Sequence, residues 1–278
     1  MAEYLRLAAL NAQNEFVTRY SAMEGVLDDR YDPTDVQVIS EAAPDSEEGG
    51  DVLCDARTYL DRHGYEVVDV PYDDEDNRPD THRLLMAVRR GRLERFERLR
   101  LAGGTGVGRT ALRASLTGGI DVIGVHLDDR TEKTRRLQAA SVLGAAAVGR
   151  TTILAGDMNA MHRWNAMAVV SRAAGVLRPL SDRLPVGVPG TEQSPMARMN
   201  SLYRRVNDMA DGGTMELMKR DGYRDADICR FPTKGMLQLD HIMVPENVYV
   251  ADLERLDVNG LSDHLAIRAD LEVYPKAS

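Results

Sequence analysis

The order of short apolar runs along the chain restricts its fold more than any other feature. Runs with the length and composition of strands lie at Leu5–Leu10, Val36–Ser40, Tyr65–Val70, Leu84–Val88, Ile120–Leu127, Thr152–Ala155, Ile242–Val244 and Leu265–Val273. Helical patterns alternate with them at 15–29, 51–63, 131–148, 161–176, 196–210 and 214–221. Strand signals continue on both sides of every Gly-, Pro- or acid-rich loop. We therefore expect one α/β domain over residues 1–278.

Polar side chains with catalytic chemistry stand at the ends of these runs. The early runs end on such residues, namely Asn11, Glu41, His126 and the pair Asp157 and Asn159. Two later runs are reversed, with the polar residues first: Asp240 precedes 242–244, and Asp263 with His264 precedes the last run. Antiparallel strands bring the start of one strand to the same edge as the end of its neighbour. The pattern therefore predicts a sheet with antiparallel strands and a site on one rim.

The chemistry that fits this set is phosphoester hydrolysis. Taken singly, an Asn or Asp after a strand is usually a turn former or a helix cap, and a lone histidine is usually a core residue. Carboxylates, amides and histidines at all six of these strand termini are not expected from turns alone. Hard carboxylate ligands favour Mg²⁺ or Mn²⁺ over zinc, and a histidine beside a carboxylate can act as acid or base near neutral pH.

Charge is distributed unevenly along the chain. Residues 28–80 hold 18 Asp and Glu against four Arg, whereas residues 83–113 hold nine Arg against two Glu. Two interpretations stay open: a phosphate-rich partner next to a metal site, or a solvated surface in a chain that prefers Arg to Lys. The net charge of −9 disfavours tight, non-specific nucleic-acid binding.

The segment Gly103–Thr110 resembles a nucleotide-binding P-loop except that Arg109 replaces the lysine. A P-loop follows a buried strand, but the preceding residues 95–100 alternate charged and apolar side chains, which is typical of an exposed segment. We therefore interpret 101–108 as a hairpin loop rather than a phosphate cradle.

Six segments together resemble the endonuclease/exonuclease/phosphatase superfamily of metal-dependent phosphohydrolases, the deoxyribonuclease-I-like proteins. They are LAALNAQN (7–14), DVQVISEA (35–42), IGVHL (123–127), ILAGDMNAM (153–161), LQLDHIMV (237–244) and LSDHLAI (261–267). They occur in the family's order and span nearly the whole chain. The resemblance implies a four-layered α/β sandwich, in which two packed mixed β-sheets are flanked by helices.

The resemblance also implies roles for individual residues. Glu41 is similar to the principal metal ligand, with Asp263 a second candidate, and Asn11 to the amide near metal and phosphate. Asp157 and Asn159 resemble the pair that orients the attacking water. His264 resembles the histidine on the scissile phosphate and Asp240 the carboxylate that orients it. His126 resembles an acid or phosphate contact, and Arg109 a phosphate-contacting arginine.

Three positions depart from the family pattern. Ser40 replaces the Gln that usually precedes the metal Glu, Gln13 replaces a carboxylate, and His241 stands where Tyr is more frequent. None of these removes a proposed ligand. The segment 178–222 holds no motif that we can assign to a role.

The sequence thus predicts a Mg²⁺- or Mn²⁺-dependent phosphoester hydrolase, and we favour a phosphodiesterase or nuclease. A small-molecule, inositol-phosphate or lipid phosphoesterase of the same family stays open, as does a catalytically silent scaffold. No obligate protein partner is evident. Cys54 and Cys229 cannot form a disulfide framework. Without an 18-residue apolar run or a signal-peptide pattern, we expect a cytoplasmic protein.

Overall fold

The computed structural model describes residues 2–12, 34–42, 57–69, 84–102, 109–146, 148–161, 213–227, 233, 238–256, 262 and 264–275. The helices expected at 15–29, 161–176 and 196–210 lie outside these residues, as do the segment 178–212 and Asp263.

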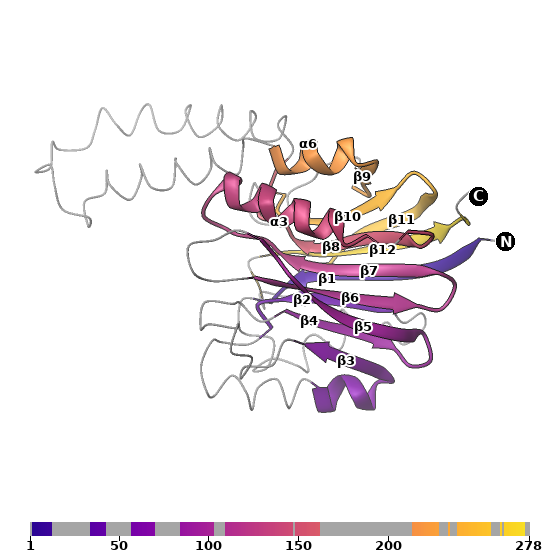
Figure 1. The fold of residues 1–278 in the computed structure, drawn as a ribbon. Helices are drawn as coiled ribbons and strands as arrows, with labels where there is room; N and C mark the ends of the chain where they lie inside the picture. The colour runs from indigo at the N-terminus through magenta and orange to yellow at the C-terminus, as the bar shows by residue number, and fades with distance from the viewer. Residues whose placement is uncertain are drawn as a thin grey trace, which may run out of the picture.

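Two six-stranded mixed sheets form the body of the molecule (Figure 1). The first sheet has the order β11-β12-β1-β2-β4-β3, with β1 (Glu3–Asn11), β2 (Val36–Ser40), β3 (Tyr65–Asp69), β4 (Leu85–Arg89), β11 (Val248–Leu256) and β12 (Ala266–Val273). The second has the order β5-β6-β7-β8-β10-β9, with β5 (Leu93–Arg100), β6 (Thr110–Leu116), β7 (Ile120–His126), β8 (Thr151–Asp157), β9 (Tyr223–Asp225) and β10 (Asp240–Pro245).

Each sheet is built around one parallel pair. β1 runs parallel to β2, and β7 runs parallel to β8. The remaining pairs are antiparallel. The carboxyl ends of each parallel pair therefore share an edge with the amino-terminal ends of β12 or β10.

The main core lies between the two sheets. Alternate residues of each strand point into it, for example Leu5 and Leu7 from β1 and Ile153 and Ala155 from β8. The sheets approach closely at Gly124, where an added Cβ would lie 2.9 Å from Met86 Cε. A glycine at this position lets β7 sit directly against β2 and β4.

Helices cover the outer faces of both sheets. Figure 1 shows α3 (Glu132–Gly144) and α6 (Gly213–Arg220) side by side over the second sheet. Met215 and Met218 of α6 pack there with Ala139 of α3. On the outer face of the first sheet, the helical residues 57–62 bring Leu60 into a separate apolar cluster. The expected fold, two mixed sheets flanked by helices, is confirmed.

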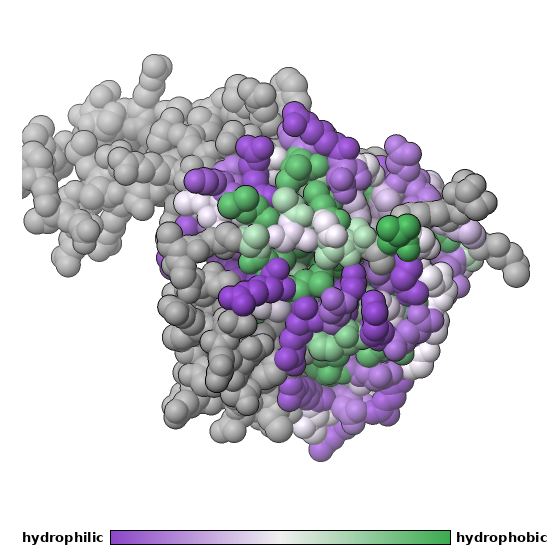
Figure 2. All heavy atoms as spheres, in the orientation of Figure 1, coloured by the Kyte–Doolittle hydropathy of each residue, from purple (hydrophilic) through white to green (hydrophobic). Residues whose placement is uncertain are grey.

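Figure 2 shows the face on which α3 and α6 lie, where hydrophilic residues separate smaller hydrophobic areas.

α3 begins at an N-cap, Thr131, whose hydroxyl accepts a hydrogen bond from Thr134 N at 3.2 Å. The helices expected at 131–148 and 214–221 are present as α3, which is shorter than expected, and α6, which is shifted by one residue.

All eight apolar runs are strands, but the sequence did not reveal β5, β6, β9 and β11. β5 and β11 are edge strands, and their charged, half-exposed residues give no continuous apolar signal. β5 and β6 pair as an antiparallel hairpin, in which Leu101 N donates to Arg109 O at 2.9 Å. A strand rather than a helix follows Gly103–Thr110, which excludes the P-loop.

Candidate active site

The register of the strands brings the predicted polar residues to one edge of both sheets. Asn11 lies opposite Ser40 in the first sheet. In the second sheet Asp157 lies between His126 on β7 and Asp240 on β10. Because the two sheets face each other, the strand ends from both meet at the same end of the sandwich.

Asn11 joins the two sheets at this point. Its Nδ2 donates to Glu41 Oε1 at 3.0 Å and to Asp157 Oδ2 at 2.8 Å. Asn11 is 1% exposed and Asp157 is 2% exposed. One buried amide therefore holds carboxylates from different sheets next to each other.

Two non-glycine residues among those described have positive φ, and both belong to this group. Glu41, directly after β2, has φ 51°, and Asn159, two residues after β8, has φ 47°. Such backbone conformations are uncommon for residues other than glycine and persist where surrounding contacts enforce them. Asn159 is held by its N–H to Asp157 Oδ1 at 2.8 Å and by Nδ2 to Leu127 O at 3.0 Å.

His126 and His264 enter the site from opposite sides. His126 Nε2 lies 3.7 Å from Glu41 Oε1 and 3.9 Å from Asp157 Oδ2. His264 Nδ1 lies 2.6 Å from Asp240 Oδ2, with both residues buried. A carboxylate on Nδ1 fixes the tautomer and directs Nε2 away from Asp240.

The segment that carries His264 is attached to the rest of the site by a hydroxyl. Ser262 Oγ donates to Asn11 O at 2.6 Å and accepts from His264 N at 3.0 Å. On the other side, Thr233 Oγ1 accepts from Asp240 N at 3.1 Å. These contacts fix the strand ends that bear Asp240 and His264.

The pKa of Asp157 is raised from 3.8 to about 6. Burial disfavours the charged form most, and the negative charge of Asp240 acts in the same direction. The charge of His264 and the hydrogen bonds from Asn11 and Asn159 oppose the rise. A carboxyl group with this pKa can accept and release a proton close to neutral pH.

The residues present suit a hard divalent cation. Glu41, His126 and Asp157 each offer one ligand atom, and these atoms lie within 4.8 Å of one another. Asp157, Asp240 and His264 form a second such group. Among the described residues, no Lys or Arg forms an ion pair with Glu41 or Asp157. Two converging carboxylates without a cationic side chain fit Mg²⁺ or Mn²⁺.

Arg109 lies beside the site, with its guanidinium turned toward the main chain. Its NH1 donates to the carbonyls of Leu127 at 2.8 Å and His126 at 3.2 Å, and its NH2 reaches Asp129 Oδ1 at 3.2 Å. These bonds support the loop after β7. Contact of Arg109 with a substrate phosphate stays a prediction.

Three residues that surround this group received no role from the sequence, although His241 was noted as a departure from the family pattern. Asp225 and His241 form a buried pair behind the loop 157–161, and Thr233 caps the start of β10. Asp225 ends strand β9, so the rule that found the other acids would have found it had that three-residue strand been recognised. Thr233 carries no comparable signal.

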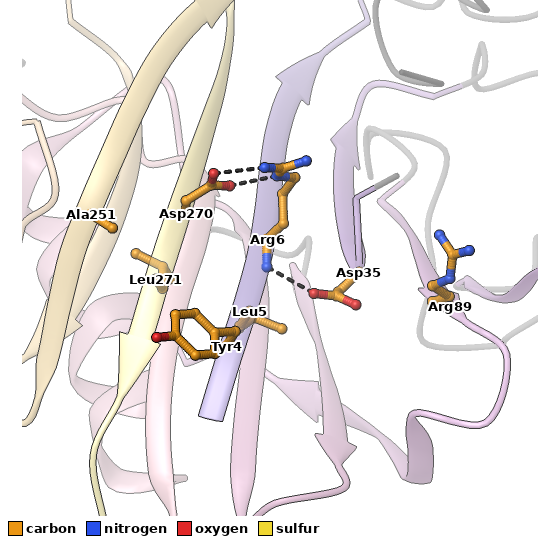
Figure 3. A pocket seen from close by; sticks show the side chains of 8 residues that line it. All are labelled: Tyr4, Leu5, Arg6, Asp35, Arg89, Ala251, Asp270 and Leu271. Carbon is orange, nitrogen blue, oxygen red and sulfur yellow. Dashed lines mark hydrogen bonds and ion pairs between the residues drawn. The ribbon is translucent and has the colours of Figure 1, made fainter. Parts of the chain in front are cut away.

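A pocket of about 450 Å³ lies elsewhere, at the opposite end of the first sheet. Figure 3 shows Arg6 in it, paired with Asp270 at 2.5 and 2.7 Å and donating from its backbone N–H to Asp35. Arg6 lies in the first half of β1, whereas Asn11 is the last residue of that strand. In this pocket Asp35 and Asp270 already accept hydrogen bonds from Arg6. The pocket contains none of the predicted site residues, so we do not assign it as the reaction site.

A family model described as the endonuclease/exonuclease/phosphatase family matches residues 30–264. This match covers most of the chain. The chain belongs to the endonuclease/exonuclease/phosphatase family. It is accordingly a hydrolase that acts on phosphoester bonds. No curated protein matches the chain in sequence.

Solved structures of the family share the fold at low identity. An endonuclease/exonuclease/phosphatase from Bacteroides vulgatus is 16% identical with a TM-score of 0.62, covering 98% of this chain and 100% of that chain. The 3′ phosphatase NExo from Neisseria, bound to product DNA hairpin, is 15% identical with a TM-score of 0.56, covering 95% and 98%. An AP endonuclease from Archaeoglobus fulgidus is 16% identical with a TM-score of 0.56, covering 95% and 98%.

None of the described helices is both long and apolar enough to cross a membrane.

Proposed function

We propose that this family member is a divalent-metal-dependent phosphodiesterase that cleaves nucleic acid. The supporting observation is the meeting of Asp157, held by Asn11, with the buried Asp240–His264 pair at the junction of two sheets. The arrangement offers a base, a phosphate-binding imidazole and a carboxylate-lined cation site within one cluster. We also propose that residues 1–278 act as a single domain.

In the proposed reaction Asp157 accepts a proton from the attacking water, whose oxygen forms the new bond to phosphorus. Asn159 orients that water. His264 Nε2 donates to a phosphoryl oxygen, while Asp240 holds the ring. The bond from phosphorus to the ester oxygen breaks, and His126 supplies the proton that the leaving oxygen takes up.

Glu41 and Asn11 would hold the cation, with Asp263, which lies outside the described residues, as a further ligand. A bound Mg²⁺ or Mn²⁺ polarises a phosphoryl oxygen and offsets the charge that develops on the phosphate.

Removal of divalent cations is expected to abolish hydrolysis. Excess EDTA should stop turnover of bis-p-nitrophenyl phosphate, and Mg²⁺ or Mn²⁺ should restore it. Glu41→Gln should raise the Mn²⁺ concentration for half-maximal rate by at least about tenfold, because it removes a charged ligand. Glu254→Gln, a matched change on an edge strand, should leave that concentration unchanged. Activity that persists in EDTA would exclude the metal mechanism.

Arginines on the edge strand β5 favour a nucleic-acid substrate over a small one. Phe96 packs against the core between the sheets, so Arg98 and Arg100, two and four residues later, share that face. Both are exposed, and the Arg98 guanidinium lies 5.8 Å from the Phe96 ring centroid. Exposed arginine over an aromatic ring suits phosphate and base contacts.

The register relates these arginines to the site. Arg98 lies in one row with Leu112 and Gly124. Arg100, two residues further along β5, therefore reaches the row of His126 and Asp157, three strand spacings or roughly 14 Å from Asp157. A small phosphoester bound at Asp157 cannot extend that far, whereas a polynucleotide can place further phosphates there.

Charge reversal on β5 separates the two substrate classes. Arg98→Glu with Arg100→Glu should slow nicking of supercoiled plasmid at least about tenfold and weaken its salt dependence, because phosphate contacts are lost. The same variant should hydrolyse bis-p-nitrophenyl phosphate within about twofold of the wild type. Arg95→Glu is the matched control, because Arg95 lies on the opposite face, in line with Glu97 and Leu99.

Equal rates on plasmid for the variant and the wild type would favour the alternative substrates, an inositol phosphate or a phospholipid headgroup. Activity on those substrates with none on plasmid would establish that alternative. The catalytically silent scaffold is disfavoured, because none of the expected catalytic residues is replaced: Glu41, Asp157, Asn159, Asp240, Asp263 and His264. All of them except Asp263, which lies outside the described residues, meet in one cluster.

A further inference from the structure

A second buried Asp–His pair lies directly behind the candidate site. His241 Nδ1 lies 2.7 Å from Asp225 Oδ2, which joins β10 to β9. His241 is 0% exposed and Asp225 is 6% exposed. The proposed reaction gives neither residue a role. Desolvation of a buried charged pair costs free energy, which is offset only where the geometry is good and further hydrogen bonds satisfy both groups. The contacts of this pair therefore decide whether its burial is favourable.

Both ring nitrogens of His241 face acceptors. Nδ1 faces the Asp225 carboxylate, and Nε2 lies 2.8 Å from the main-chain oxygen of Ala160. A neutral imidazole donates from one nitrogen only, whereas both bonds need a proton. Burial lowers the pKa of His241, but Asp225 through its charge and hydrogen bond, the Ala160 carbonyl and Asp240 together raise it. Asp225 and Ala160 therefore hold the ring from both sides.

Asp225 is itself fixed by its neighbours. Gln238 Nε2 donates to Asp225 Oδ2 at 3.0 Å, and Asp227 N donates to Oδ1 at 3.0 Å. Asp227 in turn pairs with Arg255 of β11, which belongs to the other sheet. The His241 ring thus stands on a bonded frame that spans both sheets.

The Ala160 carbonyl belongs to the loop that carries Asp157 and Asn159. Two hydrogen bonds hold the loop on its β7 side. Asn159 Nδ2 donates to Leu127 O, and Leu127 N donates to Asp157 O at 2.9 Å. On its β10 side Met158 N donates to Leu239 O at 2.9 Å, and His241 holds Ala160. Since Asn159 has positive φ, the loop needs contacts on both sides to keep that conformation.

We propose that His241, oriented by Asp225, is a positioning residue that sets the Asp157–Asn159 loop for attack by water. The inference rests on the proposed phosphodiesterase function. The bond from Nε2 to Ala160 O holds the peptide between Ala160 and Met161, one residue beyond Asn159, and thereby limits movement of the backbone that carries Asn159. The pair acts on the reaction through the loop and does not touch the phosphate.

Steady-state kinetics of three variants test the proposal. His241→Phe, which keeps the shape but loses both donors, should lower kcat about 10- to 100-fold with KM within about twofold, as expected when alignment rather than binding is lost. Asp225→Asn, which leaves His241 without its counter-charge, should act in the same direction. His241→Gln, which retains one donor, should fall between His241→Phe and the wild type.

The matched control is Asp121→Asn. Asp121 is 0% exposed and pairs with Arg150 at 2.6 Å, at the end of β7 remote from His126. It should lower the melting temperature while kcat stays within about twofold. An equal loss of kcat in Asp121→Asn, or a His241→Phe enzyme with wild-type kcat, would overturn the positioning role.

Nitrogen-15 NMR of histidine-labelled wild-type protein tests the bond to Ala160 in the unaltered protein. His241 Nε2 should carry a proton that exchanges slowly with solvent, because it donates to the buried Ala160 carbonyl. A ring in which Nε2 carries no proton would refute the proposal. Because this measurement needs no turnover, it stands even where the protein proves inactive on every phosphodiester, which would contradict the proposed function alone.

Discussion

Replacing His264 by alanine is expected to lower kcat for phosphodiester hydrolysis by about 10³-fold, and Asp157→Ala by at least as much. Each change removes a group that handles a proton or a phosphoryl oxygen during the reaction, and such groups contribute about 10²- to 10⁴-fold. Because the two residues serve one reaction step, the double variant should be little slower than the slower single one. Initial rates on bis-p-nitrophenyl phosphate and plasmid give both values.

The control for this pair is His63→Ala. His63 stacks on Tyr59, with ring centroids 4.0 Å apart, on the outer side of the first sheet and away from the site. Its removal should leave kcat unchanged. Wild-type rates in both His264→Ala and Asp157→Ala would contradict the residue roles while leaving the family membership intact.

Gly156→Ala is expected to destabilise the protein by more than about 4 kcal/mol and to abolish activity. Gly156 has φ +128°, which is almost confined to glycine, and an added Cβ would lie 2.1 Å from the Val125 carbonyl oxygen. Relief of that clash needs β8 to move away from β7. The movement would displace Asp157, the next residue. Chemical denaturation and kcat of the residual folded protein measure the two effects.

Gly149→Ala separates backbone strain from the steric clash. Gly149 has φ +81°, but an added Cβ there would meet no atom within 4 Å, and the residue lies in the turn before β8. The expected cost is about 1 kcal/mol, with unchanged kcat. A similar small cost for Gly156→Ala would show that β8 can move freely, which would refute the argument for a rigid strand end.

The positions of the candidate residues at one edge followed from the sequence because strand direction could be inferred from the order of polar and apolar residues. Asp240 and His264 precede their strands, which required antiparallel partners, and β10 and β12 provide them. The buried strands were recognisable for a different reason, because burial on both faces leaves a continuous apolar run. The roles of the residues stay predictions.

The features that escaped prediction depend on contacts rather than on pattern. β5 is half exposed and charged, so its strand nature comes from pairing with β6. The Asp225–His241 pair depends on the pairing of β10 with β9, a strand of three residues that gives no sequence signal of its own. Likewise, the turn of Arg109 toward main-chain carbonyls follows from the loop after β7, which no local pattern specifies.

The pairing of β1 with β12 has a consequence for the synthesis of the protein. Glu3 lies opposite Val273, so a strand near the start of the chain completes its sheet with one near the end. Asn11 therefore meets the segment that carries His264 only after the chain has been made as far as Ser262, 251 residues later, and such distant pairing is slow to form. Asn11, Glu41 and His126 are therefore synthesised well before Asp240 and His264. The candidate site is incomplete until this late segment has paired with β1 and β8.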